Sequence, residues 1–133
     1  MSVGPGQRSI LDTSVVLADD VAEIPGAIAV SAITIAEMQF GVLVAQRADV
    51  RAERLRRLSL LQSRFDALPV DEAVAVSYGR LAAAVVGAGR QPRRRAMDLL
   101  IAATAHAHGA TLYTKNGADF AGLEGLIDVV ALP

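Results

Sequence analysis

The sequence predicts an α/β domain with a central parallel sheet of four to five strands and helices on both faces. Short apolar runs of strand length alternate with longer segments of helical period, the pattern that crossover connections between parallel strands produce. With 133 residues, 53 % hydrophobic and 20 % charged, the chain can bury a core and has a globular composition. We therefore expect a single domain over residues 1–133, with residues 1–8, which contain Gly and Pro, forming a flexible terminus.

Five apolar runs are candidate strands. Each is bounded by turn residues or by the start of a helical pattern, and Pro69 puts the third run at an edge or irregular position because proline cannot donate to a strand ladder. The predicted strands are Ser9–Leu11, Ile28–Ser31, Ala67–Val70, Thr111–Thr114 and Ile127–Val130.

Four longer segments carry apolar residues at helical spacing. Gly87 and Gly109 follow the third and fourth of them, where a glycine commonly ends a helix. The predicted helices open at Thr34 and run through Leu43, and then cover about Val50–Phe65, Glu72–Val86 and Ala96–His108.

The charge balance and the cysteine count restrict the function. The net charge is −1, which argues against a protein that coats nucleic acid through bulk charge. The basic residues cluster at Arg51–Arg57 and Arg90–Arg95, which suits contacts to a few phosphates as well as ordinary solvated helix faces. Without cysteine, disulfides and thiolate metal sites are impossible, and no apolar run is suited to a signal peptide or a membrane span, so a cytoplasmic location is expected.

Four carboxylates stand at predicted strand-to-helix transitions or helix starts: Asp12, Glu37, Asp98 and Asp119. Each also has an ordinary structural explanation. Asp12, Thr13 and Ser14 are good N-caps for a helix starting near Val15. Glu37 follows Thr34 at the spacing of a capping box.

The other two acids also have structural alternatives. Asp98 begins a helix, where the helix dipole favours negative charge, and Asn116 could cap a short helix that contains Asp119. Taken together, however, the four acids follow a pattern, because the carboxyl ends of parallel strands share one edge of a sheet. Carboxylates gathered there would raise each other's pKa unless a cation neutralised them, and oxygen-only ligands select hard cations such as Mg²⁺ or Mn²⁺.

The chain resembles a PIN-domain ribonuclease of the VapC toxin type, from bacterial toxin–antitoxin pairs. The resemblance covers nearly the whole chain, the matching segments come in the family's order and spacing, and all four acidic positions are filled. Residues 45–89 support it only through their helical pattern. The matching segments are Leu11–Ser14, Ser31–Gly41, Asp98–Ala105 and Thr114–Phe120.

The resemblance implies a PIN-like fold and a Mg²⁺-dependent endoribonuclease, with Mn²⁺ as an alternative metal, held inactive by a cognate antitoxin. Asp12 and Asp98 would bind the metal, Glu37 would orient or deprotonate the attacking water, and Asp119 would complete the cluster or hold a second metal. Ser14, Thr114 and Asn116 would orient carboxylates or waters. The substrate would be RNA, including structured RNA such as tRNA or rRNA, and the family suggests a homodimer.

Several further residues have open interpretations. His106 and His108 point in different directions on a helix, which is poor metal-ligand geometry, so we expect ordinary surface or half-buried histidines. The expected phosphate contacts, which could equally be a solvated loop, are Arg93, Arg94, Arg95 and Lys115. We expect a set of apolar positions to lie mostly in the core, or to form an antitoxin groove where exposed: Met38, Phe40, Val42, Leu43, Leu55 and Leu58.

Three other functions compete with the nuclease. An aspartyl phosphotransferase would need a second Asp two residues after Asp12, where Ser14 stands. A receiver-like signalling domain would use Asp71 and leave Glu37, Asp98 and Asp119 without a role. A catalytically silent antitoxin-binding module is the third alternative.

Overall fold

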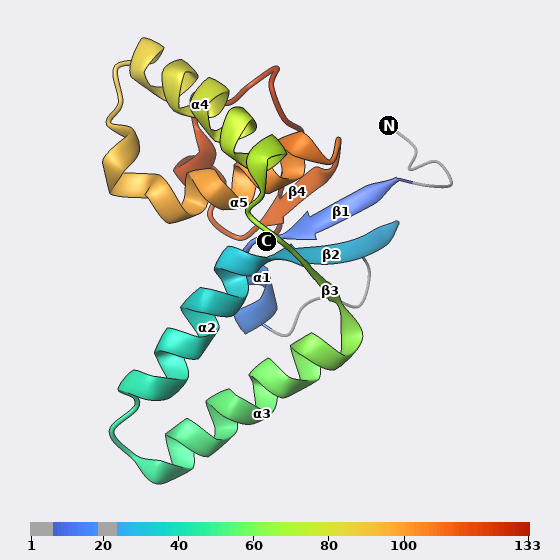
Figure 1. The fold of residues 1–133 in the computed structure, drawn as a ribbon, viewed down its shortest axis with the longest axis vertical. Coiled ribbons are helices and arrows are strands. Elements are labelled where there is room, and N and C mark those ends of the chain that lie inside the picture. The colour runs from blue at the N-terminus through green and yellow to red at the C-terminus, as the bar shows by residue number, and fades with distance from the viewer. Residues whose placement is uncertain (1–6, 19–23) are drawn as a thin grey trace.

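Five parallel strands form one sheet in the computed structural model, which describes residues 7–18 and 24–133 (Figure 1). The strand order is β3-β2-β1-β4-β5, and every neighbouring pair is parallel. Each predicted strand is confirmed, and β3, which Pro69 follows, lies at one edge of the sheet. The strands are β1 (Arg8–Leu11), β2 (Ala27–Ser31), β3 (Asp66–Leu68), β4 (Thr111–Thr114) and β5 (Val129–Ala131).

Helices cover both faces of the sheet, as the alternating pattern predicts. One face carries α1 (Thr13–Leu17), α2 (Ala32–Val44) and α3 (Ala48–Arg64), and α2 and α3 extend from the sheet as a pair (Figure 1). The other face carries α4 (Glu72–Gly87) and α5 (Ala96–Ala107). Two short 3₁₀ helices, η1 (Pro92–Arg95) and η2 (Gly117–Phe120), precede α5 and follow β4.

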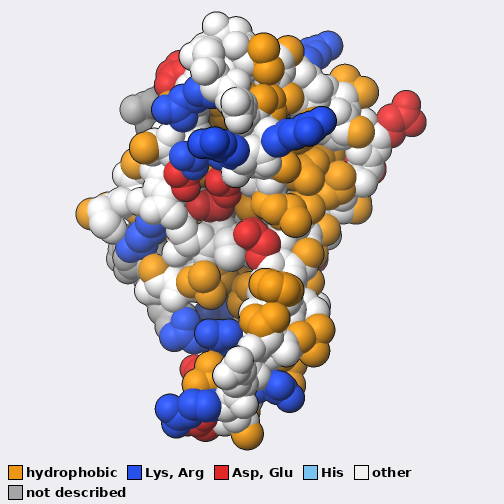
Figure 2. Space-filling model, turned by 90° about the vertical axis from the view of Figure 1, so that its left-hand side faces the viewer, with side chains coloured by type: hydrophobic (Ala, Val, Ile, Leu, Met, Phe, Trp, Pro, Cys, Tyr) orange, Lys and Arg blue, Asp and Glu red, His pale blue; other side chains and the backbone are white. Residues whose placement is uncertain are grey.

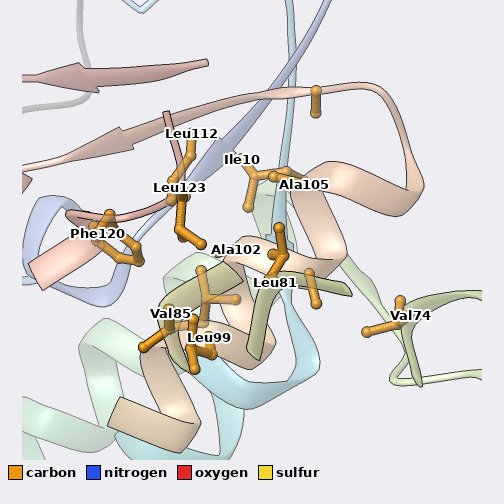
Figure 3. Close-up of a cluster of buried hydrophobic side chains, with 13 residues drawn as sticks. Ile10, Val74, Leu81, Val85, Leu99, Ala102, Ala105, Leu112, Phe120 and Leu123 are labelled. Atoms are coloured by element: carbon orange, nitrogen blue, oxygen red, sulfur yellow. The ribbon is translucent and has the colours of Figure 1, made fainter. Parts of the chain in front are cut away.

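Alternation along the central strands divides the core in two. Ile10 and Leu112 point to the α4–α5 face, where they pack with Leu81 and Leu99 (Figure 3). Their neighbours in sequence, Leu11 and Tyr113, point to the opposite face and pack against α1, α2 and α3. Because both faces are buried, the central strands read as continuous apolar runs, which is why the sequence reveals them clearly.

The topology brings the carboxyl ends of three strands together. β1 lies between β2 and β4, so residues that follow these strands meet at one edge, beside the point where the strand order reverses. Asp12 follows β1, Ser31 ends β2 and Thr114 ends β4. In the part of the chain that the structure describes, no helix is both long and apolar enough to traverse a bilayer.

Two boundaries in the structure differ from those expected. Arg8 belongs to β1, and the Gln7 amide donates to the Thr111 hydroxyl at 2.9 Å, so these two residues are not a flexible terminus; residues 1–6 lie outside those described. Helix α2 begins at Ala32 rather than Thr34, because the Ser31 hydroxyl caps it by accepting from the Ile33 N–H at 3.0 Å.

The expectation of a largely buried apolar set holds for part of that set. Met38, Val42 and Leu58 are buried, but 68 % of Phe40, 65 % of Leu43 and 49 % of Leu55 is exposed. The α2–α3 pair packs on the sheet through one side, so apolar residues on its other sides stay on the surface.

Candidate active site

Asp12 is held at the end of β1 by hydroxyl groups from two elements. Its side chain is almost fully buried, and Oδ2 accepts hydrogen bonds from the Ser14 hydroxyl at 2.7 Å and the Thr114 hydroxyl at 2.9 Å. The two hydroxyls engage the same oxygen, so Oδ1 can serve another partner. Asp12 makes no side-chain cap on α1, which removes the capping explanation for it.

Glu37 is held by a chain of hydroxyl groups rather than by a capping box. Thr13 Oγ1 donates to Glu37 Oε1 at 2.8 Å and lies 3.0 Å from Thr34 Oγ1. The Thr13 hydroxyl has one hydrogen, which it donates to the hydrogen bond with Glu37. In the contact between the two threonines, the Thr34 hydroxyl is therefore the donor and Thr13 Oγ1 the acceptor. Thr34 is therefore a buried support inside α2 and not its cap, contrary to the capping-box alternative.

The surroundings of Asp98 raise the pKa of its carboxyl group. It is half-buried in the first turn of α5, and its pKa rises from an ordinary value of 3.8 to about 6. Burial is the largest cause, followed by the negative charges of Asp12, Asp119 and Glu37, while Arg95 opposes the rise. Three acids from other parts of the chain therefore contribute to the raised pKa of Asp98.

Asp119 lies in η2 and reaches across to the segment before α5. Its Oδ1 accepts a hydrogen bond from Arg95 Nη1, and the same nitrogen is 3.9 Å from Asp98 Oδ2. The Asn116 side chain forms no cap on η2, so the capping explanation is wrong here too. Arg95, predicted as a phosphate contact, forms ion pairs with two of the four acids in this structure.

The four predicted acids thus lie near one another at one edge of the sheet: Asp12 directly follows β1, and the other three lie in α2, α5 and η2. Figure 2 shows carboxylate side chains gathered near the middle of one face, with basic side chains directly above them. As the side chains stand, no three acids or histidines in residues 7–18 and 24–133 are grouped closely enough to hold a metal ion. The donor chemistry nevertheless fits a hard divalent cation, since the possible ligands are carboxylate oxygens whose negative charges raise the pKa of Asp98. A positive charge already stands among them, because the Arg95 guanidinium pairs with Asp98 and Asp119.

The supporting residues divide into those that act through side chains and those that do not. Ser14 accepts from the Lys115 N–H at 3.0 Å, and Thr114 accepts from the Asn116 N–H at 2.9 Å, so Asn116 contributes through its backbone. Lys115 Nζ donates to the Pro133 carbonyl oxygen at 2.9 Å. Arg93 and Arg94 are exposed.

Sequence reasoning missed the roles of Thr13 and Thr34. The signal was available in part, because Thr13 and Ser14 are consecutive in a helical turn and must point in different directions. One can therefore serve Asp12 while the other serves a second acid.

This fold and this acidic edge together define a family. The model of the PIN domain family matches residues 9–126, and the chain therefore belongs to the PIN-domain family.

The chain is similar to ribonucleases from Mycobacterium tuberculosis. It is 38 % identical to Ribonuclease VapC5 of strain ATCC 25618 / H37Rv over 97 % of this chain and 96 % of that protein. It is also 38 % identical to Ribonuclease VapC8 of the same strain, over 79 % of this chain and 96 % of that protein.

The chain is also similar in fold to chains of solved structures. A chain in the crystal structure of VapBC-5 from Mycobacterium tuberculosis, a member of the VapBC family of toxin–antitoxin systems, matches with a TM-score of 0.83 and 36 % identity, covering 94 % of this chain and 98 % of that one. A chain of FitAcB from Neisseria gonorrhoeae matches with a TM-score of 0.73 and 26 % identity, covering 91 % and 95 %.

Proposed function

We propose that this protein is a metal-dependent endoribonuclease and the toxin component of a toxin–antitoxin pair. Its family and its similarity to proteins named as ribonucleases support hydrolysis of RNA phosphodiester bonds. The observation that carries the proposal is the convergence of the acids: Arg95 forms ion pairs with both Asp98 and Asp119, and the charges of Asp12, Asp119 and Glu37 contribute to the raised pKa of Asp98. Capping roles for separate acids would not require those acids to converge.

Each acid has a proposed role. Asp12 and Asp98 hold a divalent cation, which we take to be Mg²⁺ or Mn²⁺, and Glu37 and Asp119 complete its surroundings. When bound, the cation supplies charge that polarises a phosphoryl oxygen and lowers the pKa of an attacking water.

The protein's own residues orient the carboxylates and accept the proton of the attacking water. In this proposal Glu37 accepts the proton of the attacking water, and the hydrogen bond from Thr13 to Oε1 supports the role by fixing the carboxylate. Ser14 and Thr114 fix Asp12 through Oδ2, and the Asn116 N–H fixes Thr114 in turn. Arg93, Arg94, Arg95 and Lys115 are the proposed contacts to RNA phosphates.

The proposed partner is a cognate antitoxin that blocks the site. Its support is the similarity to a chain of VapBC-5, a member of the VapBC family of toxin–antitoxin systems, together with an apolar surface on α2. Phe40, Leu43 and Val44 expose half or more of their area there, as a docking surface for an amphipathic segment requires. We also propose that the chain forms a homodimer and works in the cytoplasm.

Cleavage of RNA by the purified protein tests this function. We expect cuts in total RNA with Mg²⁺ or Mn²⁺ and none with a chelator. Asp12→Asn and Asp98→Asn should each lower cleavage by at least about a hundredfold, because each removes a negatively charged ligand oxygen. Mapping the cut sites beside Asp98→Asn would also identify the target sequence.

Asp66→Asn is the matched control, because Asp66 is an exposed acid at the amino end of the edge strand β3. It should cleave like the wild type. Undiminished, metal-dependent cleavage by purified Asp12→Asn or Asp98→Asn would refute the assignment. Labelling by acetyl phosphate without RNA cleavage would favour the signalling alternative, and neither activity would favour a silent binding module.

A further inference from the structure

Arg95 lies inside the acidic cluster, where its guanidinium bridges carboxylates from two elements. Nη1 donates to Asp119 Oδ1 in η2 and is 3.9 Å from Asp98 Oδ2 in α5. These are oxygens that a divalent cation at this edge would need. In the structure, the charge neutralising them is a guanidinium of the same chain.

Arg95 also borders a second space. A cavity of about 370 Å³ lies beside the acidic cluster, and both Arg95 and Asp119 line it. Its floor is apolar, from Val85, Leu99 and Leu123, and further lining comes from Arg90, Arg94 and Gln91. The side chain of Arg95 is 40 % exposed, so it can leave the carboxylates for this cavity by changing rotamer.

We propose that Arg95 is an internal counter-ion of the acidic site, which a divalent cation displaces from Asp98 and Asp119 so that it can bind an RNA phosphate beside Arg90 and Arg94. This inference rests on the proposed ribonuclease function. It assigns Arg95 two alternating partners, a carboxylate pair in the metal-free protein and a phosphate in the metal-loaded protein. Metal binding thereby prepares the substrate site.

Electrostatics couples the two positions. A guanidinium and a divalent cation competing for the same carboxylates repel each other, so Arg95 lowers metal affinity while it stays in place. Once displaced, its planar fork suits the bidentate geometry of a phosphate. The wild type therefore exchanges some metal affinity for a gain in RNA affinity when metal binds.

Metal affinity measured without RNA tests the counter-ion role. Titration of the purified protein with Mn²⁺, followed by electron paramagnetic resonance, should show Arg95→Met binding Mn²⁺ about tenfold more tightly than the wild type. Arg95→Lys keeps the charge and should stay closer to the wild type. Arg94→Met is the matched control, since Arg94 lines the cavity but has no ion pair with the acids in the described residues, and it should change Mn²⁺ affinity less than twofold.

A second measurement tests the phosphate role. A 2′-O-methyl RNA oligonucleotide, which resists hydrolysis, should bind the wild type at least about fivefold more tightly with Mn²⁺ than with chelator, and Arg95→Met should lose most of that gain. Equal or weaker Mn²⁺ binding by Arg95→Met would overturn the counter-ion role. Tighter Mn²⁺ binding with an unchanged gain in RNA binding would overturn the phosphate role.

These outcomes are separable from failure of the proposed function. Mn²⁺ binding is read without any cleavage, whereas the ribonuclease proposal fails if wild-type protein with bound Mn²⁺ leaves RNA intact. Circular dichroism of Arg95→Met and Arg95→Lys establishes that both variants are folded before the titrations are compared.

Discussion

Two adjacent hydroxyl residues after β1 each position a different carboxylate. Thr13 donates to Glu37 and Ser14 donates to Asp12, although the two residues are neighbours in the chain. Because consecutive helical side chains diverge, one short turn can serve acids on either side of it. Thr13 and Ser14 therefore position Glu37 and Asp12 through their hydroxyl groups rather than capping α1.

Thr13→Val tests whether the Thr13 hydroxyl positions Glu37. Valine keeps the shape but removes the hydroxyl, so Glu37 loses its fixed orientation, and we expect cleavage to fall roughly tenfold to a hundredfold. Steady-state cleavage of a labelled RNA measures the effect, and thermal unfolding establishes that the fold persists. Ser63→Ala is a control, because the Ser63 hydroxyl bonds the Leu60 carbonyl on the exposed side of α3. Equal cleavage rates for Thr13→Val and the wild type would contradict this positioning role of Thr13.

The raised pKa of Asp98 predicts a pH-dependent loss of stability. The folded protein keeps a proton on Asp98 up to about pH 6, while the unfolded chain releases it near 3.8. The folded state therefore binds more protons between these values, so this carboxyl makes stability fall as pH rises from about 4 to 6, with the full cost present above that window.

Asp98→Asn removes this pH-dependent loss of folding stability, because asparagine does not ionise. In chelator, we expect the variant to match the wild type near pH 4 and to exceed it by about 1 to 2 kcal/mol at pH 7 to 8, after allowance for solvent screening. This corresponds to a rise of roughly 3 to 6 °C in Tm. Thermal unfolding across this pH range measures it, and a stability difference that does not grow with pH would count against the convergence of the four acids.

At the scale of elements, the strands were predictable and the helix boundaries less so. Central strands buried on both faces leave apolar runs that need no tertiary information. The start of α2 does depend on tertiary contacts, because Ser31 and Thr34 are both competent caps and the choice falls on Ser31 once the Thr34 hydroxyl is buried against Thr13. The sequence alone does not state which hydroxyl is buried.

Helical periodicity likewise identifies an apolar stripe but not what covers it. Phe40 and Leu43 continue the pattern of Met38 and Val42, yet only the latter pair faces the sheet. Asp12, Glu37 and Asp119 could be assigned to one edge from their places after strands, because that inference needs only parallel topology, whereas Asp98 was placed there from its position at a helix start. The ion pairs of Arg95 could not, since a flexible arginine has several reachable partners.

Two truncations in α2 separate the buried stripe from the exposed one. Met38→Ala removes a side chain that is 8 % exposed and should lower the free energy of unfolding by about 2 to 4 kcal/mol. Phe40→Ala removes one that is 68 % exposed and should cost less than about 0.5 kcal/mol in the monomer. Urea unfolding at low protein concentration measures both, and comparable losses would mean that Phe40 is covered in solution.

At the scale of the whole molecule, the charge distribution separates substrate attraction from catalysis. The net charge is −1, so the protein as a whole does not attract RNA. Attraction must come from local groups, and η1 places Arg93, Arg94 and Arg95 immediately before the helix that carries Asp98. The sheet topology thus sets a small basic segment against an acidic edge.

This arrangement predicts a shallow salt dependence of RNA binding. If only the three or four arginines around η1 contact phosphates, the logarithm of the binding constant should fall with the logarithm of salt concentration with a slope of about −2 to −3. Fluorescence anisotropy of a labelled 2′-O-methyl RNA in Mn²⁺, across a series of NaCl concentrations, measures the slope. Replacing Arg93 and Arg94 by Gln should make the slope shallower by about 1.4, because two proposed phosphate contacts are lost and each contributes about 0.7 on a single strand.

Arg80→Gln provides the comparison for this experiment, since Arg80 is exposed on α4 and outside η1. It should leave the slope unchanged, because a positive charge that does not touch a phosphate releases no counterion on binding. A slope steeper than about −5 would require a wider basic surface, such as the arginines of α3. A wild-type slope near zero would remove phosphate contact from η1 and leave recognition to the bases.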